Sequence, residues 1–334
     1  MLEAGLSVKN NYFNNSEDFN MNQTNFVGVD THKDSLACYV DGKFKQFPTT
    51  LKGFKEAIKW TKSKKWAVEG SYCFGRPFVA YLIKNGHEVY EVNPLLTKTW
   101  RQSISLNGKK NDFGDAKVIS MFAHTRSLVP VSLEAVHLKE KLTTRKLLVK
   151  QRVQIINSIK NLFSSRGKEL PFKNLTTQKA GKWLINQDDT IIKGFAQILI
   201  QQNQTIKDLE KEIENGLPEK AKALTSLKGI KELSAAVIYT ETKGRLISKP
   251  ALANYCGIAP VEYGSGKKTR HKNNKAGNRQ LNSIFFRLSS SQSRFSEKGK
   301  EYFEKKVKEG KTPRHARKCV ARNLVNIVFD ILTK

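Results

Sequence analysis

The chain has 334 residues, and its 59 lysines and arginines against 30 aspartates and glutamates give a formal net charge of +29. A chain of this length can form two or three domains with their own hydrophobic cores, which excludes a small disulfide-stapled scaffold. The large positive surplus favours a polyanionic partner over a protein that is merely cationic and soluble.

The cysteines and the apolar runs exclude further classes of protein. The four cysteines lie far apart, at Cys38, Cys73, Cys256 and Cys319. They form neither a CxxC pair nor a regular framework, so we interpret them as reduced thiols of a cytoplasmic protein. Residues 1–25 are polar and rich in asparagine, without the apolar core of a signal peptide, and we predict a disordered extension. The most apolar run, residues 191–200, is too short and too polar to span a bilayer, so we expect no membrane partner.

The first elements of the chain predict a mixed sheet. Alternating apolar and polar residues predict strands in FVGVDTH, SLACYV and KFKQF, and Asp41-Gly42 predicts a hairpin turn between the last two. A helix in LKGFKEAIKWTK, a strand in WAVEG, a helix around residues 78–83 and a strand in HEVYEV follow. The order βββαβαβ is typical of a mixed sheet with helices packed on it.

Helices dominate the middle of the chain. A basic polar loop is predicted at residues 98–110, and a helix begins in NDFGDAKVISMFAHT. A long helix is predicted at residues 138–163 and a second at about 191–217. Apolar residues recur every seven positions along the first, at Leu148, Ile155 and Leu162. The two helices could pair as a spacer or an oligomer contact, or equally form an amphipathic hairpin packed within one subunit.

From residue 220 onward we predict a separate compact domain of short helices with a basic loop. Gly229 separates two helix-like stretches, as in a helix-hairpin-helix element that offers backbone N–H groups to phosphate, although a plain glycine connection explains it equally. Ser265 lies between two glycines, where a turn residue is the commonest interpretation. Basic residues follow it at Lys267, Lys268, Arg270, His271, Lys272, Lys275 and Arg279. These charges would attract a phosphodiester, or form a solvated binding face without chemistry.

Four acidic residues are candidates for a metal site. Asp30 lies within the first apolar strand, where a charge is costly unless it binds a partner, and Glu69 ends the fourth strand. Asp112 and Asp115 are spaced i, i+3 and share one face at the start of their helix. If the two strands are neighbours, the four carboxylates surround one site that suits one or two Mg²⁺ ions. Taken singly, each acid is more often a turn residue or a helix cap.

The combined motifs resemble a known family. An aspartate in the first strand, a glutamate on the fourth and an acidic pair on a late helix resemble the RNase H fold of RuvC-like nucleases. VGVDTHKD, AVEGS, KNDFGDAKVI and LANYCGIAPVEYGSGKKTRHKNNKAGNRQL resemble the IS-one-ten insertion-sequence transposases and the related Piv DNA invertases. The resemblance covers about residues 26–330.

The resemblance implies a domain organisation and a set of partners. It implies an α/β RuvC-like DEDD catalytic domain at residues 26–130, a coiled-coil-like helical hairpin at 131–219 and a mainly α transposase domain at 220–334. It also implies that Asp30, Glu69, Asp112 and Asp115 hold Mg²⁺ and that Ser265 is the nucleophile. Expected partners are double-stranded donor and target DNA, a noncoding bridge RNA, and further copies of the chain in a dimer or tetramer, within a prokaryotic cytoplasm.

The resulting hypothesis is a site-specific recombinase in which Ser265 attacks a DNA phosphodiester and forms a phosphoserine link. Two alternatives stay open. In a Holliday-junction resolvase, the same four acids would activate water and Ser265 would be only a turn residue. In a nucleic-acid-binding protein without catalysis, neither set of residues would react.

Overall fold

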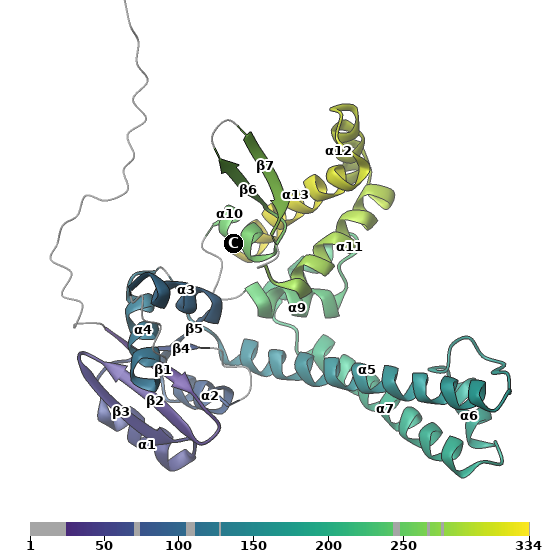
Figure 1. The fold of residues 1–334 in the computed structure, drawn as a ribbon, viewed down its shortest axis with the longest axis horizontal. Helices are drawn as coiled ribbons and strands as arrows, with labels where there is room; N and C mark the ends of the chain where they lie inside the picture. The colour runs from purple at the N-terminus through teal and green to yellow at the C-terminus, as the bar shows by residue number, and fades with distance from the viewer. Residues whose placement is uncertain are drawn as a thin grey trace, which may run out of the picture. The chain divides into compact units, whose positions relative to one another are not determined.

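The computed structural model describes residues 25–69, 74–104, 111–126, 128–242, 248–265, 268–274 and 277–333. The chain forms two compact units that divide between Ser127 and Leu128 (Figure 1). None of the described helices combines the length and the hydropathy that crossing a membrane requires. The domain boundaries proposed from the sequence stay predictions.

The first unit contains a five-stranded mixed sheet with the strand order β3-β2-β1-β4-β5. Its strands are β1 (Phe26–Thr31), β2 (Ser35–Val40), β3 (Lys43–Pro48), β4 (Lys65–Glu69) and β5 (Glu88–Val92). The first three strands pair antiparallel, whereas β4 is parallel to both β1 and β5. Asp41 and Gly42 have φ angles of 46° and 78°, as a tight hairpin turn requires. The predicted mixed sheet and its hairpin turn are confirmed.

Helices cover this sheet, and one of them was not predicted. They are α1 (Leu51–Trp60), α2 (Arg76–Lys84), α3 (Pro94–Ile104) and α4 (Asp112–His124). The prediction of a loop from Lys98 is therefore wrong up to Ile104, and residues 105–110 lie outside the described part of the chain. The Trp100 ring of α3 packs edge-on against Phe122 of α4, with 6.1 Å between centroids. This tertiary contact helps to hold a polar segment in a helix.

In the second unit, α5 (Leu133–Ser165) and α7 (Thr190–Asn215) form a long hairpin with the short α6 (Gln178–Ile185) near its end (Figure 1). Arg145 binds Glu210 with 2.6 Å between Nε and Oε1, while Arg152 donates to Asn203 over 3.2 Å, so the helices run antiparallel. The buried Ile159 packs in a cluster with residues of α6 and α7. The two helices therefore pair within one subunit, and a role in oligomer contacts stays a prediction.

The rest of the second unit is mainly helical, as predicted, around one apolar core. Its elements are α8 (Glu219–Lys222), the 3-10 helix η1 (Ala223–Ser226), α9 (Glu232–Thr242), α10 (Lys249–Tyr255), β6 (Pro260–Ser265), β7 (Lys268–Asn273), α11 (Arg279–Phe295), α12 (Glu297–Lys308) and α13 (Pro313–Thr333). Gly229 lies in the turn between η1 and α9. Two expectations are wrong: α11 and α13 are long helices, and Ser265 ends a strand instead of lying in a polar loop.

The contact between α4 and β1 leaves no room for a side chain at Gly28. A Cβ atom there would overlap the carbonyl oxygen of Ala116 and the amide nitrogen of Ser120, which are backbone atoms and cannot turn aside. We expect Gly28→Ala to lower the free energy of unfolding by about 3 kcal/mol, measured by urea denaturation. Gly194→Ala in α7, where a Cβ meets nothing within 4 Å, is the control and should be neutral or slightly stabilising. Equal effects of the two substitutions would contradict this account.

Candidate functional site

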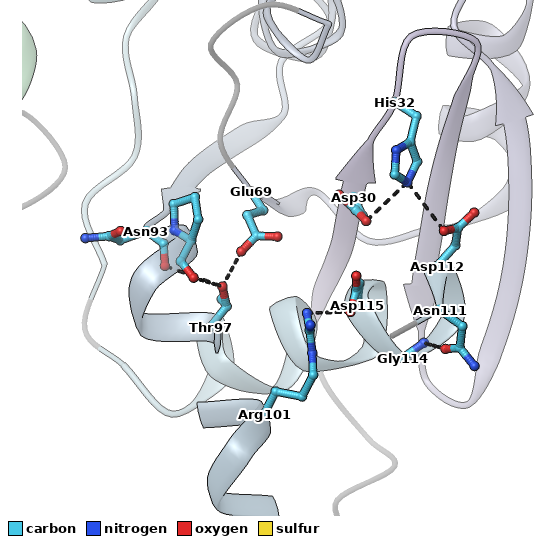
Figure 2. A network of polar contacts seen from close by, with 11 residues as sticks. Asp30, His32, Glu69, Asn93, Thr97, Arg101, Asn111, Asp112, Gly114 and Asp115 are labelled. Carbon is cyan, nitrogen blue, oxygen red and sulfur yellow. Dashed lines mark hydrogen bonds and ion pairs between the residues drawn. The ribbon is translucent and has the colours of Figure 1, made fainter. Parts of the chain in front are cut away.

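The four predicted carboxylates gather at one edge of the sheet in the first unit (Figure 2). β1 and β4 are adjacent and parallel, so Asp30, near the end of β1, and Glu69, at the end of β4, lie at the same edge. α4 packs against β1 and places Asp112 and Asp115 in its first turn. Three elements that are far apart in the sequence therefore bring these acids together, as the sequence predicted.

The first turn of α4 is well suited to carry two acids. The side chain of Asn111 caps the helix by accepting a hydrogen bond of 2.7 Å from the amide of Gly114. Negative side chains near a helix N-terminus are stabilised by the helix dipole. Although the i, i+3 spacing puts both carboxylates on one side of the helix, their surroundings differ: the Asp112 side chain is 44% exposed and that of Asp115 only 4%.

Asp30 and Asp112 share a neighbour that the sequence analysis missed, the side chain of His32. Its Nε2 lies 3.3 Å from Asp30 Oδ2 and 3.5 Å from Asp112 Oδ1 (Figure 2). Donor atoms of all three residues lie within 4.8 Å of one another. Adjacent ligands of an octahedral ion, each bound at about 2.1 Å, are about 3 Å apart, so this group fits a divalent cation. A histidine two positions after Asp30 was the available signal, because alternate residues of a strand share a face.

A second polar side chain also holds Asp112. Gln46 of β3 donates from Nε2 to Asp112 Oδ2 over 2.8 Å. The sheet register explains how it reaches the site: Asp30 pairs with Ala37 and Ala37 pairs with Gln46, so the three residues form one row across β1, β2 and β3. The small Ala37 in the middle of this row is fully buried and packs with Ala116 of α4.

The fourth acid, Glu69, is half-buried. The hydroxyl of Thr97, a fully buried residue in the first turn of α3, donates a hydrogen bond to its carboxylate. Burial raises the pKa of Glu69, the hydrogen bond from Thr97 opposes that rise, and the negative charge of Asp30 adds to it. The charge of Asp115 also acts on Glu69 in the raising direction. A divalent cation would offset the repulsion among these carboxylates.

Arg101 of α3 forms an ion pair with the buried Asp115 (Figure 2). A buried carboxylate is costly without such a partner. The helix that the sequence analysis missed thus supplies two groups to the site, the Thr97 hydroxyl and the Arg101 guanidinium. Among the described residues, Asp30, His32 and Asp112 have donor atoms close enough together to bind one cation, and their oxygens and imidazole fit hard divalent ions of the Mg²⁺ and Mn²⁺ type. Glu69 and Asp115 lie outside this three-residue group and contact Thr97 and Arg101.

The other predicted site residues belong to the second unit. Ser265 is the last residue of β6 and is in register with Lys268 of β7. Arg270 and Lys272 follow at alternate positions of the same strand, and Arg279 begins α11. Lys267 and Lys275 lie outside the described residues. The structure therefore places the serine and several of the basic residues on one β-hairpin.

Two family models match the chain. Residues 27–165 match DEDD_Tnp_IS110, which is described as a transposase. Residues 221–304 match a model described as a transposase of the IS116/IS110/IS902 family. No curated protein gives a match. The first matched range contains the four clustered carboxylates, and the second contains Ser265.

Proposed function

Since the chain belongs to the IS116/IS110/IS902 family of DNA transposases, we propose that it cuts and rejoins DNA at an insertion sequence through a phosphoserine intermediate. The observation that supports this most is the convergence of Asp30, Glu69, Asp112 and Asp115 from β1, β4 and α4 at one sheet edge. Several carboxylates close together can bind divalent cations, and phosphoryl transfer needs such cations to neutralise the negative charge on the transferred phosphate.

The carboxylates would bind Mg²⁺. One or two ions held by the four acids would stabilise the negative charge that develops on the phosphorane oxygens. The chain's own residues prepare the site: Gln46 fixes one oxygen of Asp112, and Thr97 orients Glu69. The ion pair with Arg101 holds Asp115, the most buried of the four acids, in place.

Ser265 would supply the nucleophile. Its hydroxyl oxygen attacks a DNA phosphorus, the bond from that phosphorus to one sugar oxygen breaks, and the serine proton passes to that departing oxygen, which leaves as a hydroxyl. The phosphoserine link conserves the energy of the broken bond. A hydroxyl of a second strand then attacks the same phosphorus and releases the serine, so strands are exchanged without ATP.

The proposal also includes two kinds of partner, further copies of the chain and an RNA. The resemblance to the family supports a dimer or tetramer in which Ser265 of one subunit serves the carboxylates of another, and a bridge RNA that pairs with donor and target DNA. The net charge of +29 suits binding of both nucleic acids.

Sequencing the RNA that copurifies with the full chain tests the guide: we expect one discrete structured species, and unselected cellular fragments would contradict it.

A recombination assay tests the function itself. Two DNA fragments that carry sites complementary to the copurified RNA are incubated with the protein, and joined products are detected by amplification across the new junction. We expect products with MgCl₂ and none with EDTA. Cleavage of a four-way DNA junction without joined products would instead favour the resolvase.

His32 gives a prediction about the metal. Imidazole binds Mn²⁺ more readily than Mg²⁺, which prefers oxygen ligands, so a His32 ligand should favour Mn²⁺. We expect His32→Ala to weaken Mn²⁺ binding about 10-fold or more and Mg²⁺ binding much less, measured by isothermal titration calorimetry. His124→Ala, an exposed histidine at the far end of α4, is the control. Equal losses for both ions would show that His32 is not a ligand.

A further inference from the structure

Two adjoining pockets in the second unit gather positive charge. The larger, of about 590 Å³, is lined by the α10–β6 connection, α12 and the start of α13, and the smaller, of about 300 Å³, by Arg279, Asn282 and Phe286 of α11 among others. Both pockets are lined by Gly257, Arg314 and Lys318. The cationic side chains of the larger pocket are Lys306, Lys311, Arg314, Lys318 and Arg322. Of the lining residues that the structure describes, none is Asp or Glu.

The positive charges are only partly balanced from outside the pockets. Glu309 forms ion pairs with Lys306 and Lys311, with nitrogen–oxygen distances of 2.8 and 2.9 Å. Arg314 has no ion-pair partner within the described part of the chain. Burial and the positive charge of Arg314 together lower the pKa of Lys318. An anion bound between these two residues would relieve that repulsion.

The spacing along α13 concentrates the charge on one face. Arg314, Lys318 and Arg322 stand at i, i+4 and i+8, so they follow one another along the helix surface. Like charges at this spacing destabilise a helix by a few tenths of a kcal/mol per pair when nothing binds them. The N-terminal end of α13, which begins at Pro313, adds the positive end of the helix dipole.

The floor shared by the pockets is held in place by hydrogen bonds. Asn282 of α11 donates to the carbonyl oxygens of Cys256 and Gly257 over 3.2 and 3.0 Å. The backbone of Asn278 donates to the carbonyl oxygen of Tyr255 over 2.6 Å. The loop between α10 and β6 is thereby fixed to the start of α11.

The pockets also stand at the base of the hairpin that carries Ser265. Pro260, which lines the larger pocket, is the first residue of β6, and Ser265 is its last. The five residue steps from Pro260 to Ser265 span about 17 Å. This length corresponds to about five steps along a nucleic-acid strand, at ~3.4 Å per step.

We propose that the two pockets form a groove for the sugar–phosphate backbone of a nucleic-acid strand, with Arg314 and Lys318 between successive phosphates. The groove would hold the strand about five steps from the phosphate that meets Ser265. Only the distance between the groove and Ser265 rests on the proposed function, because the groove can bind a sugar–phosphate backbone whether or not Ser265 reacts.

Binding of the full chain to labelled DNA and RNA tests the groove. A duplex DNA and a hairpin RNA of equal length and arbitrary sequence are titrated by fluorescence anisotropy over a series of salt concentrations. For Arg314→Gln combined with Lys318→Gln, we expect about 10-fold weaker binding and a salt slope smaller by about 2, since each lost phosphate contact removes about 0.9. Loss with DNA alone, RNA alone or both supports the groove and identifies its strand.

The matched control removes the same two charges elsewhere. Arg294→Gln with Lys298→Gln changes an exposed arginine and lysine at the same spacing, near the junction of α11 and α12. We expect it to alter binding less than 2-fold. Arg314→Lys with Lys318→Arg keeps the charges and should retain the slope, which separates charge from misfolding. Equal weakening by the two charge-removing pairs would overturn the groove, because only net charge would then matter.

Discussion

Replacing Asp30 by asparagine is expected to slow metal-dependent DNA cleavage by at least about 10³-fold, which corresponds to about 4 kcal/mol of transition-state stabilisation. Asp30 is central to the site: it lies 3.3 Å from His32, and its charge acts on Glu69. Asparagine keeps the shape of the side chain and one acceptor oxygen but removes the negative charge that binds a cation. The rate is measured on a DNA substrate in single-turnover experiments with MgCl₂.

The control for this experiment is Asp34→Asn. Asp34 is an exposed acid in the connection between β1 and β2, close in sequence to Asp30 but outside the carboxylate group. Its substitution should leave the cleavage rate within about 2-fold. Unchanged cleavage by Asp30→Asn would exclude the carboxylate site as the seat of the reaction and would favour a binding protein or a different active site.

Ser265→Ala should abolish the covalent protein–DNA link. A nicked substrate that loses a short fragment after cleavage traps the phosphoserine, and the trapped species migrates as protein-linked DNA in a denaturing gel. We expect a loss of at least about 10³-fold in this species, because alanine has no oxygen to form the bond. Recombination should fall with it.

The matched substitution is Ser283→Ala, an exposed serine of α11 in the same unit. It should leave the trapped species unchanged. Recombination by Ser265→Ala at the normal rate would refute the covalent scheme. If cleavage persists in that variant and still needs the carboxylates, the acids activate water, as in the resolvase alternative.

Local patterns were enough to predict much of the first unit. The strands of the sheet show alternating polarity, and Asp41-Gly42 supplies the left-handed turn between two of them. Helix α3 was missed because its residues from Lys98 to Ile104 are mostly polar, and contacts from other elements stabilise it, such as Trp100 on Phe122. The β6–β7 hairpin was missed because the sequence around Gly-Ser-Gly has the composition of a loop.

The acidic residues of the site could also be predicted from local sequence patterns. Asp30 is conspicuous in an apolar strand, and Asp112 and Asp115 have helical spacing. No local sequence pattern singles out Gln46 or Arg101, because only the strand register and the packing of α3 bring them to the carboxylates. Sequence patterns therefore revealed the carboxylates of the site but not the residues that orient them.

The close packing of α4 on β1 at Gly28 bears on the engineering of the carboxylate site. Backbone contact, not side-chain choice, sets the spacing between the strand acid and the helix acids, so this spacing resists mutation. The side chains of His32 and Gln46, which contact the acids, are not subject to this backbone constraint. A library that varies these two positions while keeping residue 28 fixed should yield variants with altered ion preference on an unchanged scaffold.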